Sequence, residues 1–390
     1  MLRTCCAAAS KVSQTPLQGL RVLDLTQIYQ GPYCTFLMAQ AGAEVIKIEP
    51  PGGERLRPPP GARGSMAFAM LNANKLSVVL DLKAEEDRQR FLDLVPTADL
   101  VVENFGPGAM DRLGLGWQRL KQINSRLIYV SGTGFGLSGP DHDLLAMDHT
   151  VQAAVGMLAA TGGPDDPPTR AGGAPSDFMG GIHMYAGAMT ALLGRHATGE
   201  GTQVEVSMMD AMYFNLSTEF STLYATGKNP QRDRNRSPST VVPYSIYPCD
   251  DGGYVAVICI QERHWHALAK LMGREDLITD ERFSPKARFR NESEVNRLVS
   301  AWMQTLPRET VYRLLRDAKI PVAPVREVNE VYGNEHMRER GSLLSLEHPT
   351  MGPVNLPVSP LRFSNFDAAE YAFYPELGSA NEVVFGDAQR

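Results

Sequence analysis

Asp177 is the residue best placed for chemistry, in the segment APSDFMGGIHMYAGAMTALLGRH. Pro175 precedes it and a long run of small and apolar residues follows, a pattern that predicts a helix beginning here. The first N–H groups of a helix lack partners and its dipole favours negative charge, so an Asp at this point is an ordinary cap. The same position favours an ionised carboxylate nucleophile. Local spacing alone leaves both roles open.

A second group of candidates lies in VENFGPGAMDRLGLG, just past a predicted strand. Asn104, Phe105 and Gly106 form a turn there, and Arg112 follows one helical turn later. This pattern fits either a plain turn with a solvated Arg or a slot for a flat, phosphorylated ligand, with Phe105 stacking and Arg112 pairing a phosphate. A third candidate, Lys75 in NANKLS, stands beside Asn72 and Asn74 at a helix-to-strand junction, where an exposed cap is the simpler interpretation.

Other chemistries are poorly supported. GFGLSG (134–139) matches G-x-G-x-x-G, but Pro140 follows at once and no strand ending in an acid comes about 20 residues later, as a dinucleotide fingerprint requires. The eight histidines form no H-E-x-x-H motif and the five cysteines have no metal-ligand spacing, so no metal site is expected. No G-x-S-x-G elbow supports Ser-His-Asp chemistry. A carboxylate nucleophile is therefore the best-supported catalyst.

Composition limits the partners. The chain has 390 residues, 43% hydrophobic content and a net charge of −6, which favours a globular protein and disfavours nucleic acid or an anionic membrane as partner. Scattered cysteines indicate a reducing compartment, and no apolar run is long enough to span a membrane. The N-terminal stretch is basic and weakly resembles a mitochondrial transit peptide. We expect a cytoplasmic protein, with mitochondria as the alternative.

The order of the predicted elements indicates the fold that holds these residues. Short apolar strands alternate with helical stretches as far as about residue 228, which predicts an α/β fold with a parallel sheet covered on both faces. A polar, turn-rich stretch, GKNPQRDRNRSPST, then leads to a hairpin and three helices. We therefore expect a Rossmann-like large domain (1–228), a smaller domain (229–325) and a C-terminal segment (326–390) that returns to the large domain, beginning within IPVAPVREVNEVY (320–332).

Taken together, the segments resemble the class III coenzyme A transferase family, also called the formyl-CoA transferase or carnitine-dehydratase family. The resemblance covers most of the chain. Its ordered segments include LRVLDLTQIYQGPYCTFLMAQAGAEVIKIEPPGGE, NANKLSVVLDLK, VVENFGPGAMDRLGLG, LIYVSGTGFGLSGP, PPTRAGGAPSDFMGG and EHPTMGPVNLPVSPLRFS.

The resemblance implies a Rossmann-like large domain, a smaller α+β domain and an interlocked homodimer. It implies transfer of coenzyme A from an acyl-CoA to a free acid, with Asp177 as nucleophile and acyl-CoA as substrate rather than a permanently bound cofactor. Gly180 and Gly181 are expected to help stabilise oxyanions. The residues implied to bind coenzyme A are Asn72, Asn74, Lys75, Asn104, Phe105, Gly106 and Arg112.

Departures from the family pattern narrow the chemistry. The racemase branch carries a His where Met147 stands and a small-domain Glu where Gln261 stands; His149 and Glu262 are each out of register. The formyl-CoA:oxalate enzymes carry a Gln at the position of Tyr29, with Gln30 adjacent here. Tyr29, Gln30 and Gln261 are therefore the candidate substrate-binding residues.

The phosphate contacts and the acid also differ from that branch. Pro50 replaces a CoA-contacting Arg of the formyl-CoA:oxalate enzymes, so Arg55 or Arg57 is expected to take its place. We predict a CoA transferase acting on a small, dicarboxylic acid, because the loop GGERLRPPPGAR is rich in arginine. The alternatives are a 2-methylacyl-CoA racemase and a non-catalytic CoA-binding protein.

Overall fold

The computed structural model describes residues 14–59, 61–232 and 241–386 of the chain. They form two compact units by internal contacts. The first unit contains the described residues up to 155, residues 171–214 and those from 333 onward; the second contains residues 156–170 and 215–332. The predicted boundaries after residues 228 and 325 both fall within the second unit. Most of the stretch compared with a transit peptide lies outside the described residues.

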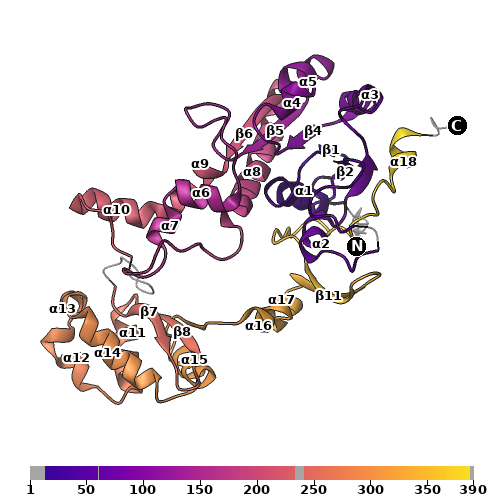
Figure 1. Ribbon diagram of the computed structural model, residues 1–390. Helices are drawn as coiled ribbons and strands as arrows, with labels where there is room; N and C mark the ends of the chain where they lie inside the picture. Colours follow the sequence, from indigo (N-terminus) through magenta and orange to yellow (C-terminus); the bar gives the residue numbers. More distant parts are fainter. Residues whose placement is uncertain (1–13, 60, 233–240, 387–390) are drawn as a thin grey trace, which may run out of the picture. The chain divides into compact units, whose positions relative to one another are not determined.

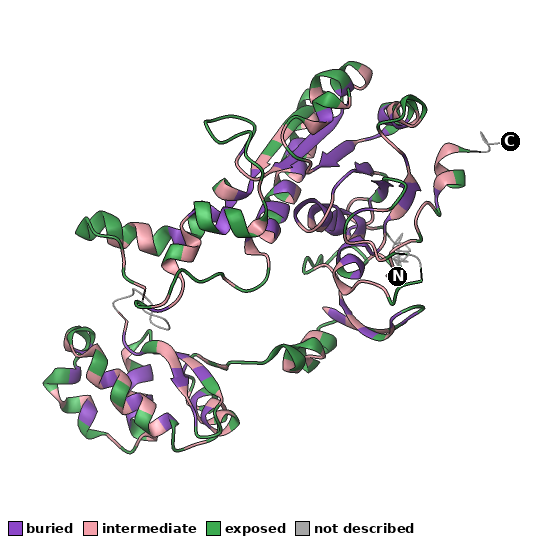
Figure 2. Cartoon of the chain, in the orientation of Figure 1, coloured by how far each residue is buried: buried purple, intermediate pink, exposed green. Residues whose placement is uncertain are grey.

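A six-stranded sheet forms the centre of the first unit, and all of its pairings are parallel (Figure 1). Its strand order, β3-β2-β1-β4-β5-β6, is that of the doubly wound Rossmann fold. The strands are β1 (Arg21–Asp24), β2 (Glu44–Glu49), β3 (Leu76–Val79), β4 (Leu100–Glu103), β5 (Ile128–Thr133) and β6 (Thr202–Ser207). The central strands are apolar at nearly every position because helices cover both faces, and Figure 2 colours them largely as buried.

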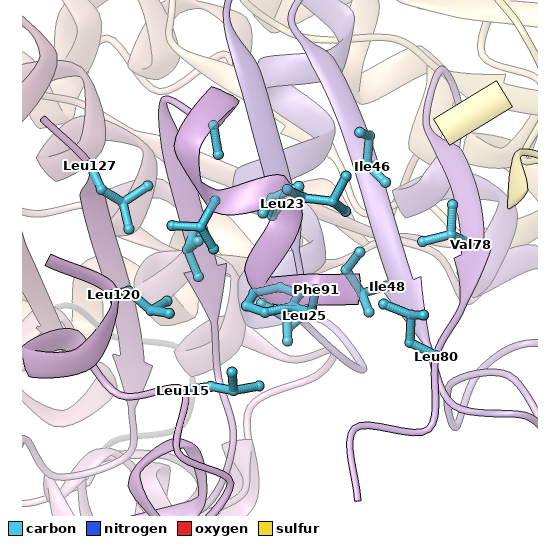
Figure 3. Packing of buried hydrophobic residues seen from close by; sticks show 14 of the residues in the cluster. Leu23, Leu25, Ile46, Ile48, Val78, Leu80, Phe91, Leu115, Leu120 and Leu127 are labelled. Carbon is cyan, nitrogen blue, oxygen red and sulfur yellow. The ribbon is translucent and has the colours of Figure 1, made fainter. Parts of the chain in front are cut away.

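The two faces of this sheet have separate cores, since successive side chains of a strand point to opposite sides. On one face Leu23 packs with Phe91, Leu115 and Leu120, among the residues labelled in Figure 3. These come from α3 (Glu85–Leu94), the turn before α5, and α5 (Trp117–Ile123), with α4 (Ala109–Arg112) adjacent. On the other face Val22 packs against α1 (Gln30–Gln40) and α8 (Pro175–Thr198). The unit is thus a three-layer α/β/α structure.

A further, smaller core in the first unit involves a hairpin near the C-terminal end of the chain. Strands β10 (Leu343–His348) and β11 (Gly352–Pro357) pair antiparallel, and Leu356 packs with Ala69 of α2 (Met66–Asn72). The remaining elements of this unit are η1 (Val95–Thr97), α6 (Asp148–Ala154), α9 (Met208–Tyr213), α17 (Glu335–Glu339) and α18 (Asn381–Phe385), while η2 (Phe214–Leu216) crosses the unit boundary.

The second unit has its own core around Trp265, Val299 and Leu315. Its sheet is antiparallel, in the order β7-β8-β9. The strands are β7 (Tyr244–Pro248), β8 (Tyr254–Ile258) and β9 (Val322–Pro324). The helices are α7 (Met157–Ala160), α10 (Ser217–Thr226), α11 (Glu262–Leu271), α12 (Asp276–Thr279), η3 (Glu281–Phe283), α13 (Pro285–Arg290), α14 (Glu292–Met303), α15 (Arg308–Asp317) and α16 (Val328–Tyr332).

The prediction of an α/β fold, with a parallel sheet and a separate smaller sheet, is confirmed. One expectation about residues 320–332 differs from the structure: β9 pairs with β8, so this segment stays with the small sheet. The hairpin β7-β8 has an edge that needs a partner, and the apolar residues after α15 supply it. Within the described part of the chain, no helix is long and apolar enough to cross a bilayer.

Candidate active site

The N-terminus of α8 is capped by a carboxylate from another helix. Asp148, the first residue of α6, accepts the Ser176 N–H at 2.8 Å, and its other oxygen accepts the Gln152 amide at 2.6 Å. The Ser176 hydroxyl also donates to the Asp148 carbonyl oxygen at 3.3 Å. The capping role considered for Asp177 therefore belongs to Asp148, and Asp177 is left available for chemistry.

Asp177 lies in the first turn of α8 and is only 8% exposed. Among the described residues, its carboxylate has no hydrogen-bond partner. Burial, together with the nearby charge of Asp148, raises the pKa of Asp177 to about 7. Burial and the Asp148 charge thus act against the ionisation that the helix N-terminus is expected to favour.

The carboxylate of Asp177 lines a cavity of about 530 Å³ in the first unit. The loops that follow β1, β4 and β5 form its walls, so it opens at the carboxyl ends of parallel strands, where ligands bind in open α/β sheets. The walls are largely apolar; the lining side chains include Phe105, Phe135, Leu137, Leu144, Leu145, Met147 and Met208.

Asn104, Phe105 and Gly106 lie together in the wall of this cavity, as the sequence predicts. The Asn104 side chain holds the backbone of Gln27: its oxygen accepts the Gln27 N–H at 2.8 Å and its amide donates to the Gln27 carbonyl oxygen at 3.0 Å. This clamp fixes the loop that precedes α1. Asn104 therefore has a positioning role that its sequence context did not reveal.

Asn72 and Lys75 are instead buried in a polar cluster that does not line the cavity. The Lys75 ammonium donates to Asp24 at 3.0 Å, Thr35 at 2.8 Å and Asn72 at 2.9 Å. Burial lowers the pKa of Lys75 to about 8, against the attraction of Asp24. Their polar atoms are satisfied within the protein, so this geometry does not support the predicted coenzyme A contacts.

Asn74 also lies outside the cavity wall and holds the C-terminal segment in place. Its backbone is left-handed (φ 62°), and its side-chain oxygen accepts the Ala372 N–H at 3.1 Å and the Gln40 amide at 2.7 Å. An Asn suits this conformation because its short polar side chain tolerates left-handed backbone. The role seen here is structural, in place of the predicted ligand contact.

The three arginines considered for phosphate binding differ in whether they line the cavity and whether they are paired within the protein. Arg112 is exposed, donates to the Pro107 carbonyl oxygen at 3.0 Å and does not line the cavity. Arg57 is paired with Glu49 through two bonds of 2.6 Å, and its guanidinium lies 4.5 Å from the centre of the Phe68 ring. Arg55 is exposed and lines the cavity. Arg55 is thus the better placed of the two arginines expected to meet a phosphate.

The three candidate substrate-binding residues have different surroundings. Gln30 is 2% exposed and lines the cavity together with Asp177. Tyr29 does not line it; its ring lies 5.9 Å from that of Phe178. Gln261 belongs to the second unit, where it is the N-cap of α11. Of the three, the structure brings only Gln30 beside the Asp177 cavity within the first unit.

The glycines expected to stabilise oxyanions serve close helix packing instead. Gly180 and Gly181 lie inside α8, where each N–H bonds to the carbonyl four residues earlier. A Cβ atom at Gly181 would come 2.5 Å from the Gln30 carbonyl oxygen. Both residues are glycine because the start of α1 crosses α8 at this point.

Within the first unit, Met147 stands at the racemase position of this cavity, where the racemase branch carries a His. His149 is exposed, and Glu262 of the second unit is paired with Arg288. Among the described residues, no group of three or more His, Cys, Asp or Glu side chains is arranged to hold a metal ion.

Sequence reasoning missed the conformation of Ile28. This cavity-lining residue has φ 68°, a left-handed backbone that is strained for a β-branched side chain. Glu54 accepts its N–H at 3.3 Å, and the Asn104 clamp holds the residue before it. No local sequence signal marks such a position, because the strain is held by side chains distant in the sequence.

Comparisons with known proteins agree with this geometry. The pattern of CoA-transferase family III matches residues 17–381. The chain is 38% identical to acetyl-CoA:oxalate CoA-transferase of Acetobacter aceti, over 90% of each chain. It is 36% identical to succinyl-CoA:mesaconate CoA-transferase of Haloarcula hispanica, over 85% of this chain and 86% of the other.

A solved structure is similar over nearly the whole chain. The CaiB/BaiF family protein from Brucella suis superimposes with a TM-score of 0.85 and 31% identity, covering 96% of this chain and 99% of the other. The match to the family pattern spans both units, including every residue discussed for the cavity. The chain is therefore a member of CoA-transferase family III.

Proposed function

We propose that this enzyme transfers coenzyme A from an acyl-CoA donor to a small carboxylic acid, with Asp177 as the covalent nucleophile. The observation that carries the proposal is the state of Asp177: it is buried, has no hydrogen-bond partner among the described residues and lines the cavity at the ends of β4 and β5. A carboxylate that performs only a structural role would be hydrogen-bonded at such burial, as Asp148 is.

The chemistry begins with attack by an Asp177 carboxylate oxygen on the thioester carbon of the donor. The C–S bond breaks, giving a mixed anhydride and coenzyme A thiolate. The thiolate then attacks the Asp177 carbonyl carbon; the anhydride C–O bond breaks, the donor acid leaves and an aspartyl thioester forms.

The acceptor acid reverses this sequence. Its carboxylate attacks the aspartyl thioester, which releases the thiolate and forms a second anhydride. The thiolate attacks the acceptor carbonyl, giving the new acyl-CoA and restoring the Asp177 carboxylate. One thioester replaces another, so the overall exchange is close to balanced and requires no ATP.

We propose the classes of donor and acceptor from the names of the relatives. Their names give acetyl-CoA or succinyl-CoA as donor and oxalate or mesaconate as acceptor. Both acceptors are dicarboxylates, and we propose the same class here. Asn104, Phe105 and Gly106 are proposed to border the coenzyme A, and exposed Arg55 supplies a cation at the cavity for its phosphates.

We further propose a homodimer, interlocked as in the family. Large apolar side chains are exposed at Leu193 (74%), Phe214 (78%) and Tyr224 (93%), in α8, η2 and α10. Burial of such residues against a second chain would stabilise the enzyme. Light scattering of the purified protein tests this. For location we retain the cytoplasm, with mitochondria as the alternative; Cys34, Cys249 and Cys259 are free thiols, as a reducing compartment requires.

The test is a transfer assay with acetyl-CoA, succinyl-CoA and formyl-CoA against a panel of small mono- and dicarboxylic acids. We expect the wild-type enzyme to form a new acyl-CoA with at least one dicarboxylate, and Asp177→Ala to form none. A parallel incubation in deuterated solvent without acceptor checks for α-proton exchange. Exchange into a 2-methylacyl-CoA, with no transfer to any acid, would replace this proposal with racemase chemistry.

A further inference from the structure

Gln30 occupies a slot formed by two glycine backbones. A Cβ atom at Gly180 of α8 would come 2.8 Å from the Gln30 amide nitrogen, and one at Gly132 of β5 would come 3.0 Å from its amide carbon. An alanine at Gly180 would therefore displace the amide, whereas an alanine at Gly132 would first meet the Met184 sulfur, at 2.5 Å. The helix therefore leaves room for the Gln30 amide at Gly180, and the strand leaves room at Gly132 for Met184 and the Gln30 amide together.

The amide in this slot is poorly satisfied by the protein. A Gln amide has two N–H donors and an oxygen with two lone pairs. The one bond it makes among the described residues is long, 3.4 Å from its nitrogen to the Thr133 carbonyl oxygen. Gln30 is nevertheless 2% exposed. Its amide oxygen accepts no hydrogen bond from the described residues and is not an enclosed atom, so it is open to the cavity, where a ligand can reach it.

The unused hydrogen-bonding groups of the Gln30 amide lie close to Asp177, the proposed nucleophile. Gly180 follows Asp177 by three residues in α8, so the two positions share one face of the helix within a single turn. Gln30 and Asp177 also line the same cavity. The polar residues of the lining also include Asn104, which is engaged with Gln27, whereas the Gln30 amide keeps hydrogen-bonding groups for a ligand.

We infer that the Gln30 amide is a specificity-determining residue that binds the reacting carboxylate of the acceptor acid. This inference rests on the proposed transferase function. The free N–H of Gln30 donates to one carboxylate oxygen of the acceptor and turns the other oxygen toward the carbonyl carbon of the Asp177 thioester. Its own oxygen is available to a hydroxyl or acid proton on the ligand. The ligand class is a carboxylic acid small enough to enter beside Met208 and Gly132.

The decisive variant is Gln30→Met, which keeps the shape of the side chain and removes its hydrogen bonds. We expect kcat/KM for the acceptor to fall about 10- to 100-fold, the effect of losing one hydrogen bond to a charged group. The half-reaction with donor acyl-CoA, followed as labelled Asp177, should change less than the acceptor step. The thermal midpoint should stay the same or rise, because the replaced amide was poorly satisfied.

Gln40→Met is the matched control on the same helix. The Gln40 amide is engaged at both its nitrogen and its oxygen, donating to Asn74 at 2.7 Å and accepting the Ser359 N–H at 3.3 Å. Its replacement should lower the thermal midpoint and leave acceptor kcat/KM unchanged. Gly180→Ala provides a second test, since its new methyl group would displace the Gln30 amide while leaving that amide in the sequence; acceptor kcat/KM should fall here too.

The outcomes separate this inference from the proposed function. A wild-type enzyme that moves coenzyme A to no acid in the panel would refute the proposed function. A wild-type enzyme that transfers, with Gln30→Met equally active toward the acceptor, would overturn the inference alone. Loss of stability in Gln30→Met equal to that in Gln40→Met, without selective loss of the acceptor step, would also overturn it, because Gln30 would then be structural.

Discussion

Two sets of buried polar side chains at helix α1 differ in how completely their hydrogen bonds are made. Around its second turn, Asp24, Thr35, Asn72 and Lys75 form the Asp24 cluster, in which each charge meets several partners within 3.0 Å. At its first residue, Gln30 meets one long bond, and nearby Asp177 meets none among the described residues. Burial alone therefore does not identify a functional group. The unmet hydrogen bonds distinguish the side of α1 that we propose to be catalytic from the structural side.

The Asp177→Asn variant tests this difference most strongly. The account expects transfer to fall by on the order of 10³-fold or more, because an amide is not a nucleophile here. It also expects a gain in the free energy of unfolding at pH 8. A pKa raised from 3.8 to about 7 means that stability is lost progressively between about pH 4 and pH 7 as the carboxyl ionises, by about 1.4 kcal/mol per pKa unit, and the full loss is present at pH 8. Loss of stability at pH 8 would place Asp177 with the structural group.

The opposite behaviour is expected of the Asp24 cluster. Lys75→Met should lower the free energy of unfolding by about 3–5 kcal/mol, because it leaves the buried Asp24 carboxylate unpaired. Chemical denaturation measures this directly. The double variant Asp24→Asn/Lys75→Met should recover part of the loss. A change in the affinity for acyl-CoA without loss of stability would instead assign Lys75 to ligand binding.

The pH dependence sharpens the account of Asp177. Attack requires the ionised form, so kcat/KM for the donor should rise with pH through about 7 and level off above it. Asp148→Asn removes the like charge that contributes to the raised pKa while keeping an oxygen for the Ser176 N–H. In the Asp148→Asn variant, the rise of donor kcat/KM with pH should therefore occur at lower pH. A rise that stays at the same pH would show that Asp148 has no influence on the nucleophile.

The smallest expected effect concerns the loop before α1. Asn104→Ala removes two bonds to Gln27 and should cost about 1–2 kcal/mol of stability, with a higher KM for acyl-CoA as the cavity wall loosens. Asn124→Ala is the control, because Asn124 donates to the Val95 and Ala98 carbonyl oxygens away from the cavity. It should lose similar stability with KM unchanged. Equal KM values in the two variants would remove Asn104 from the site.

The sequence predicts the fold well where periodic patterns are long. EVIKIE is β2 from end to end, and the run after Pro175 is α8, because alternating or helical apolar spacing reflects local geometry. Short elements such as β9 depend on the hairpin edge that they join, which the local sequence does not describe. The second unit also includes residues 156–170, a combination fixed by tertiary contacts alone.

The site was predicted in part for a similar reason. Residue type and the family resemblance single out Asp177 as the proposed nucleophile, and Asn104 to Gly106, which follow a strand, line the same cavity. Neither reveals whether a buried side chain is satisfied. The family resemblance implies that Lys75 binds coenzyme A, but its ammonium is bonded to Asp24; Asp148 caps α8 and, after burial, contributes to the raised pKa of Asp177. Those assignments depend on partners far away in the chain.

The central claim, that Asp177 carries the acyl and coenzyme A groups in turn, is tested most directly by trapping. Wild-type enzyme is incubated with the donor acyl-CoA alone, treated with hydroxylamine or borohydride, and digested for peptide mapping by mass spectrometry. The account predicts a hydroxamate or a reduced side chain at Asp177, in the peptide beginning near Ala171, and none after prior addition of the acceptor. Rapid transfer with no adduct at Asp177, or an adduct at another residue, would contradict it.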